Sequence, residues 1–214
     1  MKFRDRSHAG TVLADRLAVE ANGAQTIILG IPRGGIVLAD IVATRLGADF
    51  DIVIPRKLGA PDNKELAIGA VMQDGTTYLN TYLVNALRIH QDYIEKEKRL
   101  QIDEIIRRSA AYRRQGQEYG IKGKNAILVD DGIATGATVI ASARWARKQN
   151  PATLTIAVPV APTQSVEVLE EEADRVLAVH TARDFGSVGQ FYDQFDPVTD
   201  ERVQGIMQSR GLLP

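Results

Sequence analysis

Residues 127–139 read Ile-Leu-Val-Asp-Asp-Gly-Ile-Ala-Thr-Gly-Ala-Thr-Val and carry the strongest indication of the fold. It begins with the end of an apolar run that is typical of a strand buried in a parallel sheet. Two acids, Asp130 and Asp131, follow this strand, and a turn rich in glycine and threonine then opens a helix. Gly132 and Gly136 permit a tight turn whose amides, with the positive end of the helix, suit a phosphate. The stretch therefore predicts a strand, an anion-binding turn and a helix.

On either side of this stretch, short runs rich in β-branched residues predict four further strands of the same buried kind. With the strand just described, the predicted strands are 26–31, 50–55, 125–130, 153–158 and 175–179. Crossover helices are predicted at 35–46, 136–149 and 164–172, and a leading helix at Thr11–Ala21. Strands that alternate with helices indicate an α/β fold with a five-stranded parallel sheet.

The connection between the second and third strands is long, at about 70 residues where a crossover needs about a dozen. It predicts an insertion at about 60–120. Leu66–Met72 and Thr76–Leu79 form a predicted hairpin around Asp74-Gly75, a dipeptide that favours hairpin turns. We expect the whole chain, 1–214, to be one domain with this insertion and a hood at about 180–214.

A helical stretch is predicted from Arg88 to Arg114, because opposite charges recur at i,i+4 spacing along an exposed face. The predicted pairs are Glu95 with Arg99, Asp103 with Arg107 and Glu104 with Arg108. A solvated face explains this pattern most simply. A subunit contact or a lid over the site is the alternative. A last helix is predicted after Thr199, a capping residue followed by Asp200 and Glu201.

The adjacent acids carry the chemical information. They would repel a phosphate, whereas carboxylates accept hydrogen bonds from the vicinal hydroxyls of a ribose, directly or through Mg²⁺. No Lys follows Gly136, so this is not the G-x-x-x-x-G-K-[ST] nucleotide loop. The G-x-G-x-x-G fingerprint is also missing, which counts against a dinucleotide-binding oxidoreductase.

The strand, the acid pair and the Thr-Gly-x-Thr turn resemble the type I phosphoribosyltransferase family. The resemblance implies a sheet of order 2-1-3-4-5 flanked by helices. It also implies that Asp130 and Asp131 hold the ribose of phosphoribosyl pyrophosphate (PRPP) and Mg²⁺, directly or through water. The residues implied for the 5-phosphate form one loop, Ile133, Ala134, Thr135, Gly136, Ala137 and Thr138.

The loop after the first strand, Gly30-Ile31-Pro32-Arg33-Gly34-Gly35, lies where the family grips pyrophosphate with backbone amides. Pro55-Arg56-Lys57 closes the second strand, where the family commonly places a basic residue near that group. The resemblance thus implies that Arg33, Gly34, Gly35, Arg56 and Lys57 bind pyrophosphate. Because parallel strands end at one edge, we expect Arg33 and Arg56 to reach one anion. With the acid pair, Arg33 and Lys57 are the predicted catalytic residues.

The implied reaction is Mg²⁺-dependent transfer of the phosphoribosyl group from PRPP to a purine or pyrimidine base, in nucleotide salvage. Ala134 stands where enzymes for 6-oxopurines usually carry an acid, which argues against hypoxanthine or guanine of that pattern. Adenine, orotate and other acceptors stay open. Phe185, Phe191 or Tyr192 is expected to stack on the base, or else to pack the carboxyl-terminal segment onto the sheet. Asp184 would accept from an exocyclic amine.

The remaining predictions concern the setting of the protein. Twenty-six Lys and Arg against 27 Asp and Glu give a net charge of -1, which draws neither nucleic acid nor an anionic membrane. We expect a cytoplasmic homodimer whose loop Gly59–Glu65 is mobile, and a core position for Trp145. His8, His90 and His180 lack metal-ligand spacing. The alternative to an enzyme is a catalytically silent sensor of PRPP or a nucleotide.

Overall fold

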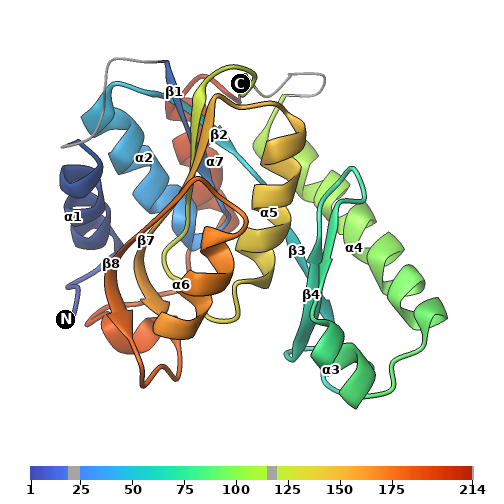
Figure 1. The fold of residues 1–214 in the computed structure, drawn as a ribbon. Helices are drawn as coiled ribbons and strands as arrows, with labels where there is room; N and C mark the ends of the chain where they lie inside the picture. Colours follow the sequence, from blue (N-terminus) through green and yellow to red (C-terminus); the bar gives the residue numbers. More distant parts are fainter. Residues whose placement is uncertain (19–24, 115–119, 214) are drawn as a thin grey trace.

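The central sheet has the predicted topology. The computed structural model describes residues 1–18, 25–114 and 120–213. Its five parallel strands are hydrogen-bonded in the order β2-β1-β6-β7-β8, which is the order 2-1-3-4-5 of the predicted core strands (Figure 1). The strands are β1 Thr26–Gly30, β2 Asp49–Ile52, β6 Asn125–Val129, β7 Thr153–Pro162 and β8 Arg175–Ala182.

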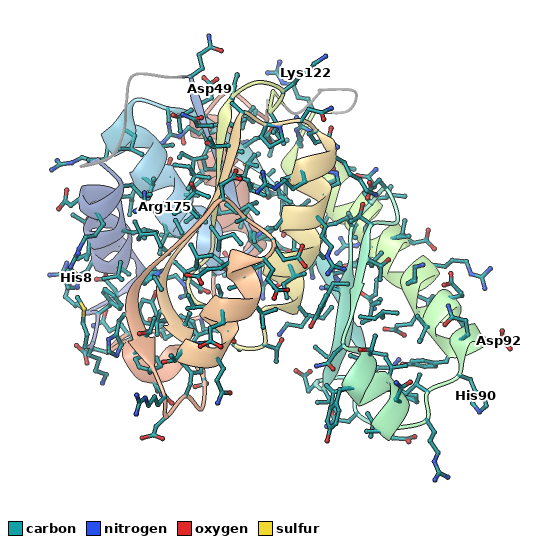
Figure 2. The ribbon with its side chains drawn as sticks, viewed as in Figure 1. His8, Asp49, His90, Asp92, Lys122 and Arg175 are labelled. Carbon is teal, nitrogen blue, oxygen red and sulfur yellow. The ribbon has the colours of Figure 1, made fainter. Side chains whose placement is uncertain are left out.

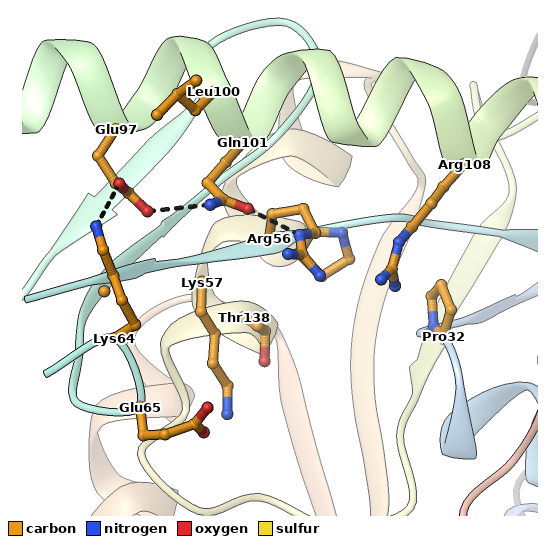
Figure 3. Close-up of a pocket in the computed structure, with 12 residues that line it drawn as sticks. Pro32, Arg56, Lys57, Lys64, Glu65, Glu97, Leu100, Gln101, Arg108 and Thr138 are labelled. Carbon is orange, nitrogen blue, oxygen red and sulfur yellow. Dashed lines mark hydrogen bonds and ion pairs between the residues drawn. The ribbon is translucent and has the colours of Figure 1, made fainter.

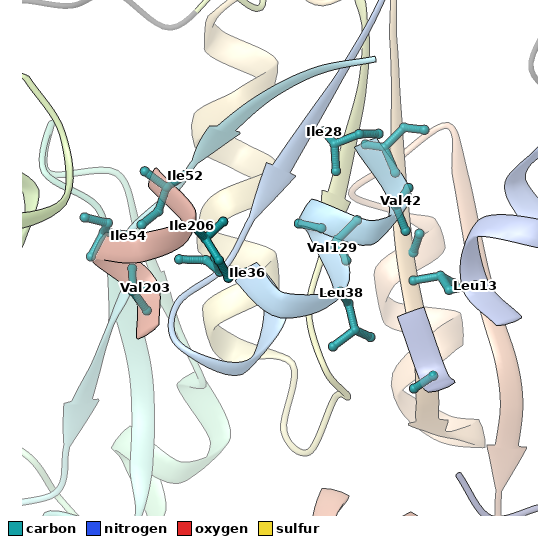
Figure 4. Close-up of a cluster of buried hydrophobic side chains, with 14 of the residues drawn as sticks. Leu13, Ile28, Ile36, Leu38, Val42, Ile52, Ile54, Val129, Val203 and Ile206 are labelled. Atoms are coloured by element: carbon teal, nitrogen blue, oxygen red, sulfur yellow. The ribbon is translucent and has the colours of Figure 1, made fainter. Parts of the chain in front are cut away.

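Helices cover both faces of this sheet (Figure 1). On one face lie α1 Arg6–Ala18, α2 Gly34–Leu46 and α7 Asp200–Ser209, and on the other lie α5 Ala137–Lys148 and α6 Thr163–Glu170. Successive side chains of a strand point to opposite faces. Ile28 therefore packs in the core beneath α1, α2 and α7 (Figure 4), while Ile27 and Leu29 pack in the core beneath α5 and α6. Burial on both faces explains why the strands read as continuous apolar runs.

Helix α1 and strands β7 and β8 extend several residues beyond their predicted bounds. The leading helix α1 begins at Arg6 rather than Thr11, because the Asp5 carboxylate accepts from the His8 amide at 2.7 Å and caps it. Residues 19–21 of the predicted helix lie outside the described residues. Strands β7 and β8 also continue beyond their predicted ends. Pro159 has no N–H to donate, yet pairing resumes after it, and 160–162 pairs with 180–182. The first residues assigned to the hood are thus part of the sheet.

The insertion contains the predicted hairpin and one strand that the sequence did not predict. β3 Arg56–Gly59, β4 Ala67–Val71 and β5 Thr77–Leu79 form an antiparallel sheet in that order. Helix α4 Gln91–Tyr112 occupies the stretch predicted over 88–114, and a short helix that the sequence did not predict, α3 Thr81–Ala86, precedes it. Helix α4 packs on β3, away from the central sheet (Figure 1).

Only one of the predicted ion pairs on α4 is present. Glu104 bonds Arg108 at 2.8 Å, but it also bonds Arg107 at 2.7 Å, and Glu95 bonds Lys98 at 3.2 Å. Residues three apart on a helix are neighbours just as residues four apart are, so these i,i+3 pairs replace the two others. Of the helices in the described ranges, none is long and apolar enough to cross a membrane.

The carboxyl end of α4 is anchored to the core by polar contacts. Arg113, just past the helix, donates to the Asp51 carboxylate of β2 at 2.7 Å, with both side chains only 5% exposed. Burial raises the pKa of Asp51 to about 6, although the positive charge of Arg113 acts to lower it. The Tyr112 hydroxyl donates to the Asp200 carboxylate at the start of α7. These contacts join the insertion to β2 and α7.

The hairpin packing predicts a difference between two glycine substitutions. A Cβ on Gly69 of β4 would lie 2.2 Å from the Tyr78 carbonyl oxygen, whereas one on Gly205, in α7, would meet no atom within 4 Å. In urea unfolding, Gly69→Ala should lose about 1–3 kcal/mol of unfolding free energy through overpacking. Gly205→Ala should gain about 0.5–1 kcal/mol, since Gly disfavours a helix interior. Equal stability of the two variants would contradict this packing.

Candidate functional site

The candidate site lies where β1 and β6 end side by side. Gly30 is in register with Val129, so the loop after β1 begins beside Asp130 and Asp131. These segments enclose a hollow of about 300 Å³, which we call the inner hollow. Its walls are Ile31–Gly34, Pro55, Lys57, the segment Asp130–Gly136, Thr138, Val139, Val188 and Phe195. The switch point of a doubly wound sheet is where such folds bind ligands.

Gly34 and Gly35 occupy positions with no room for a side chain. A Cβ on Gly35 would lie 2.6 Å from the Val129 carbonyl oxygen and 2.7 Å from the Asp130 Cα. A Cβ on Gly34 would lie 1.8 Å from a carboxylate oxygen of Asp131. The peptide between Pro32 and Arg33 is cis. The Arg-Gly-Gly sequence therefore permits the loop after β1 to lie directly against the acid pair.

The two acids interact with each other. The Asp131 amide donates to the Asp130 carboxylate at 2.8 Å. Burial raises the pKa of Asp130 well above its ordinary value, and the neighbouring Asp131 charge raises it further. Burial also raises the pKa of Asp131, although the guanidinium of Arg6 opposes the rise. The pair is held in a setting that disfavours two uncompensated negative charges.

Arg6 is a functional residue that the sequence did not reveal. Its Nε donates to the Asp131 carboxylate at 2.7 Å, and its Nη1 donates to the Asp196 carbonyl at 2.6 Å. Its guanidinium carbon lies 3.8 Å from the centre of the Phe195 ring. Arg6 thus ties helix α1 and the carboxyl-terminal loop to one acid of the pair. Because 125 residues separate Arg6 from Asp131, no local spacing in the sequence points to this contact.

The glycine- and threonine-rich loop divides its residues between the core and the hollow. Ile133 and Ala137 are buried in the core with 1% and 3% exposure, so only their backbone is available to a ligand. Thr135 is exposed and Thr138 is half-buried. Gly136 has a φ of 77°, a conformation that favours glycine, and immediately precedes helix α5. This geometry is the helix amino terminus that suits a phosphate.

The predicted pyrophosphate residues do not all line the same hollow. Arg33 and Lys57 line the inner hollow, and Arg33 lies 3.5 Å from Asp200. Arg56 does not line it, because its Nε donates to Gln101 of α4 at 2.9 Å. Arg33 and Arg56, which were expected to reach one anion, therefore do not line the same hollow, whereas Lys57 lines it together with Arg33.

The predicted aromatic residues pack chiefly into the core. Phe191 ends a short 3-10 helix, Val188–Phe191, and is buried with Tyr192, whose hydroxyl donates to the Asp131 carbonyl at 2.6 Å. Phe185 is half-buried against Phe191, with ring centres 5.0 Å apart. The aromatic side chain that lines the inner hollow is Phe195. Phe191 and Tyr192 thus pack the carboxyl-terminal segment onto the sheet, as the second of the two expectations stated. The sequence did not point to Phe195 as a residue of the hollow.

Two acids are available for a metal ion here. The described residues contain no cluster of three or more His, Asp or Glu that would form an all-protein metal site. His8 and His90 lie on opposite sides of the molecule (Figure 2). Mg²⁺ commonly takes one or two carboxylates and completes its shell with water and phosphate oxygens. The adjacent carboxylates of Asp130 and Asp131 fit that requirement.

Removing Arg6 should change the titration of Asp131. Arg6 lowers the pKa of this carboxyl against the effect of burial, so Arg6→Met should raise the pKa of Asp131 still further. The carboxyl would then be protonated at higher pH than in the wild type. Carbon-13 NMR of the aspartate carboxyl groups measures this directly. Arg16→Met, an exposed change on the same helix, is the matched control. The same Asp131 pKa in both variants would refute the assigned role of Arg6.

Comparison with known proteins places this geometry in context. Two Mycobacterium tuberculosis proteins, MT0597 and Rv0571c, both provisionally named phosphoribosyl transferases, are 38% identical over 205 residues, which is 96% of this chain. The match covers 46% of each, so the chain spans less than half the length of these curated relatives.

Solved structures agree on the fold. The crystal structure of TT1426 from Thermus thermophilus has a TM-score of 0.81 and 42% identity, with both chains covered in full. The AQ2163 protein from Aquifex aeolicus has a TM-score of 0.51 at 10% identity, over 86% of this chain and 78% of that one. Residues 6–196 match the phosphoribosyl transferase domain family. With that match around the acid pair and its two loops, this chain belongs to the phosphoribosyl transferase family.

Proposed function

We propose that the chain transfers the 5-phosphoribosyl group of PRPP to a nitrogen of a nucleobase and releases pyrophosphate. The observation that carries the proposal is the position of Asp130 and Asp131, between the glycine loop after β1 and the amino terminus of α5. A ribose on the acids has a phosphate-binding helix end on one side and an amide-lined loop on the other. PRPP fits this arrangement because its ribose carries a pyrophosphate at the anomeric carbon and a phosphate at the 5-position.

The reaction breaks the bond from the anomeric carbon to the pyrophosphate oxygen and forms a bond from that carbon to the acceptor nitrogen. The nitrogen loses its proton to water or to the departing pyrophosphate. Negative charge develops on the leaving pyrophosphate and positive charge on the sugar ring. Arg33 and Lys57 line the hollow where they can stabilise the leaving group. Bound Mg²⁺ would supply further charge neutralisation for pyrophosphate. The carboxylates orient the ribose hydroxyls and favour the cationic ring.

The acceptor is a base that needs no protein acid beside the phosphate loop. Ala134 is exposed at the position from which such an acid would act, and a methyl group cannot transfer a proton. Val188 and Phe195 give the inner hollow an apolar wall. The Phe195 ring already contacts the Arg6 guanidinium and the Tyr192 ring, so a planar base would pack against Val188 and beside Phe195. Adenine, orotate and other bases that do not depend on an acid at that position are the acceptors to test first.

The test is pyrophosphate release from PRPP with Mg²⁺, across a panel of purine and pyrimidine bases. We expect release with one base or a small group of bases. Asp130→Asn with Asp131→Asn should reduce PRPP affinity at least about tenfold, the effect of losing one charged hydrogen bond. Asp103→Asn, an exposed change on α4, is the matched control. PRPP binding without release for any base would favour a sensor, and unchanged affinity in the double variant would exclude the ribose assignment.

The phosphate loop has a separate test. Gly136 adopts a positive φ that other residues rarely adopt, and Thr135 offers an exposed hydroxyl. Gly136→Ala and Thr135→Val should both weaken binding of PRPP, and they should weaken binding of ribose 5-phosphate in parallel. Inorganic pyrophosphate lacks the 5-phosphate, so its affinity should stay unchanged. Equal loss for all three ligands would show that the loop does not select the 5-phosphate.

A further inference from the structure

A second hollow lies beside the inner one, between β3, the loop that follows it and α4. Its volume is about 540 Å³, within the range of small-molecule sites. We call it the outer hollow, and its charged and amide side chains include Arg56, Lys57, Lys64, Glu97, Gln101 and Arg108 (Figure 3). Lys57 lines both hollows. The transfer reaction proposed above uses only the inner hollow.

Glu97, one of the two acids that line the outer hollow, is already paired. Glu97 of α4 accepts from the Lys64 ammonium at 2.8 Å and from the Gln101 amide at 3.0 Å. Lys64 also donates to the Tyr93 hydroxyl at 2.5 Å. Figure 3 shows Lys64, Glu65 and Glu97 at one end of the hollow, and Arg56 and Arg108 at the other. Among the described residues, neither lining acid forms an ion pair with Arg56 or Arg108, although the charge of Glu97 acts on Arg56 from farther away.

The arginine end carries an excess of positive charge. Arg56 is half-buried, its bond to Gln101 is to a neutral amide, and no carboxylate in the described ranges lies within ion-pair distance of it. Arg108 bonds Glu104, but that carboxylate also bonds Arg107. Burial lowers the pKa of Arg56 and the charge of Arg108 lowers it further, while the charges of Glu104 and Glu97 oppose this. Glu104 is thus the carboxylate that bonds within this cluster of three guanidinium groups.

A partly buried cation without a counter-ion is costly, and an anion relieves that cost. Guanidinium groups match phosphate oxygens with paired hydrogen bonds. Arg56 comes from β3 and Arg108 from α4, so their ligand must offer anionic oxygens in more than one direction. We propose that the outer hollow binds a second phosphate-bearing ligand, a polyphosphate held by Arg56 and Arg108 beside the substrate site. Because Lys57 lines both hollows, it would then couple binding of this ligand to the inner hollow.

The probe is inorganic pyrophosphate, titrated calorimetrically into protein whose inner hollow is saturated with PRPP and Mg²⁺. We expect binding to the wild type, weakened at least about tenfold by Arg108→Gln, the effect of one lost charged contact. Arg99→Gln removes the same charge from an exposed position of α4 outside the hollow and should leave the affinity unchanged within about twofold. PRPP affinity should be the same in all three proteins.

Absence of pyrophosphate binding to the PRPP-saturated wild type would overturn the proposal, and so would equal weakening by the two substitutions. A parallel titration with a nucleoside triphosphate separates the two sources of a polyphosphate. If the nucleoside triphosphate binds more tightly than pyrophosphate and this binding depends on Arg108, the ligand is a nucleotide. If it binds more weakly than pyrophosphate, the ligand is an inorganic polyphosphate. If the protein binds no PRPP, the proposed transfer fails, whereas titration of the free protein with pyrophosphate still tests the outer hollow through Arg108→Gln.

Discussion

The site depends on the close approach of two backbones at the end of the sheet. Parallel pairing of β1 with β6 brings the loop after β1 against the acid pair, and only glycine fits at positions 34 and 35. The same approach starts α2 at Gly34, because the chain turns from the acids directly into the helix. Helix α2 in turn supports α1 and α7. One steric limit therefore links the ligand loop to the packing of a whole face.

The acid pair is costly to bury, and the fold compensates for it unevenly. Asp131 has Arg6 as a counter-charge at 2.7 Å, while Asp130 has the Asp131 amide. Burial raises the pKa of both carboxyls, so a bound cation or sugar finds groups whose own charges are incompletely compensated. Carboxylates in such a setting gain more from a ligand than exposed carboxylates do. The site's affinity and its cost to stability have the same origin.

The parallel sheet and the hairpin were predictable because their signals are local: apolar runs, glycine turns and the lengths between them. The strand order came instead from the resemblance to a known family, because pairing between distant strands leaves no local pattern. The acid pair and the two loops at its sides, like the hairpin, were predictable from local signals. Arg6 and Phe195 were not, since their role arises from contacts across more than 60 residues of chain. Nor did the positions of Arg33 and Arg56, each just after a parallel strand, indicate that Gln101 on an inserted helix would bond Arg56.

The contact between Arg6 and Asp131 also defines how much chain the site needs. The strands and loops that touch the inner hollow begin at β1, yet the cation beside Asp131 comes from α1, and its second anchor is the carbonyl of Asp196. Residues 6–196 are also the extent of the match to the family. The shortest chain that preserves the surroundings of the acid pair therefore runs from Arg6 to Asp196, because the Arg6 guanidinium bonds both Asp131 and Asp196. A chain shortened at either end to the limits of the sheet would lose Arg6 or its anchor, and the charge of Asp131 would lose its compensation.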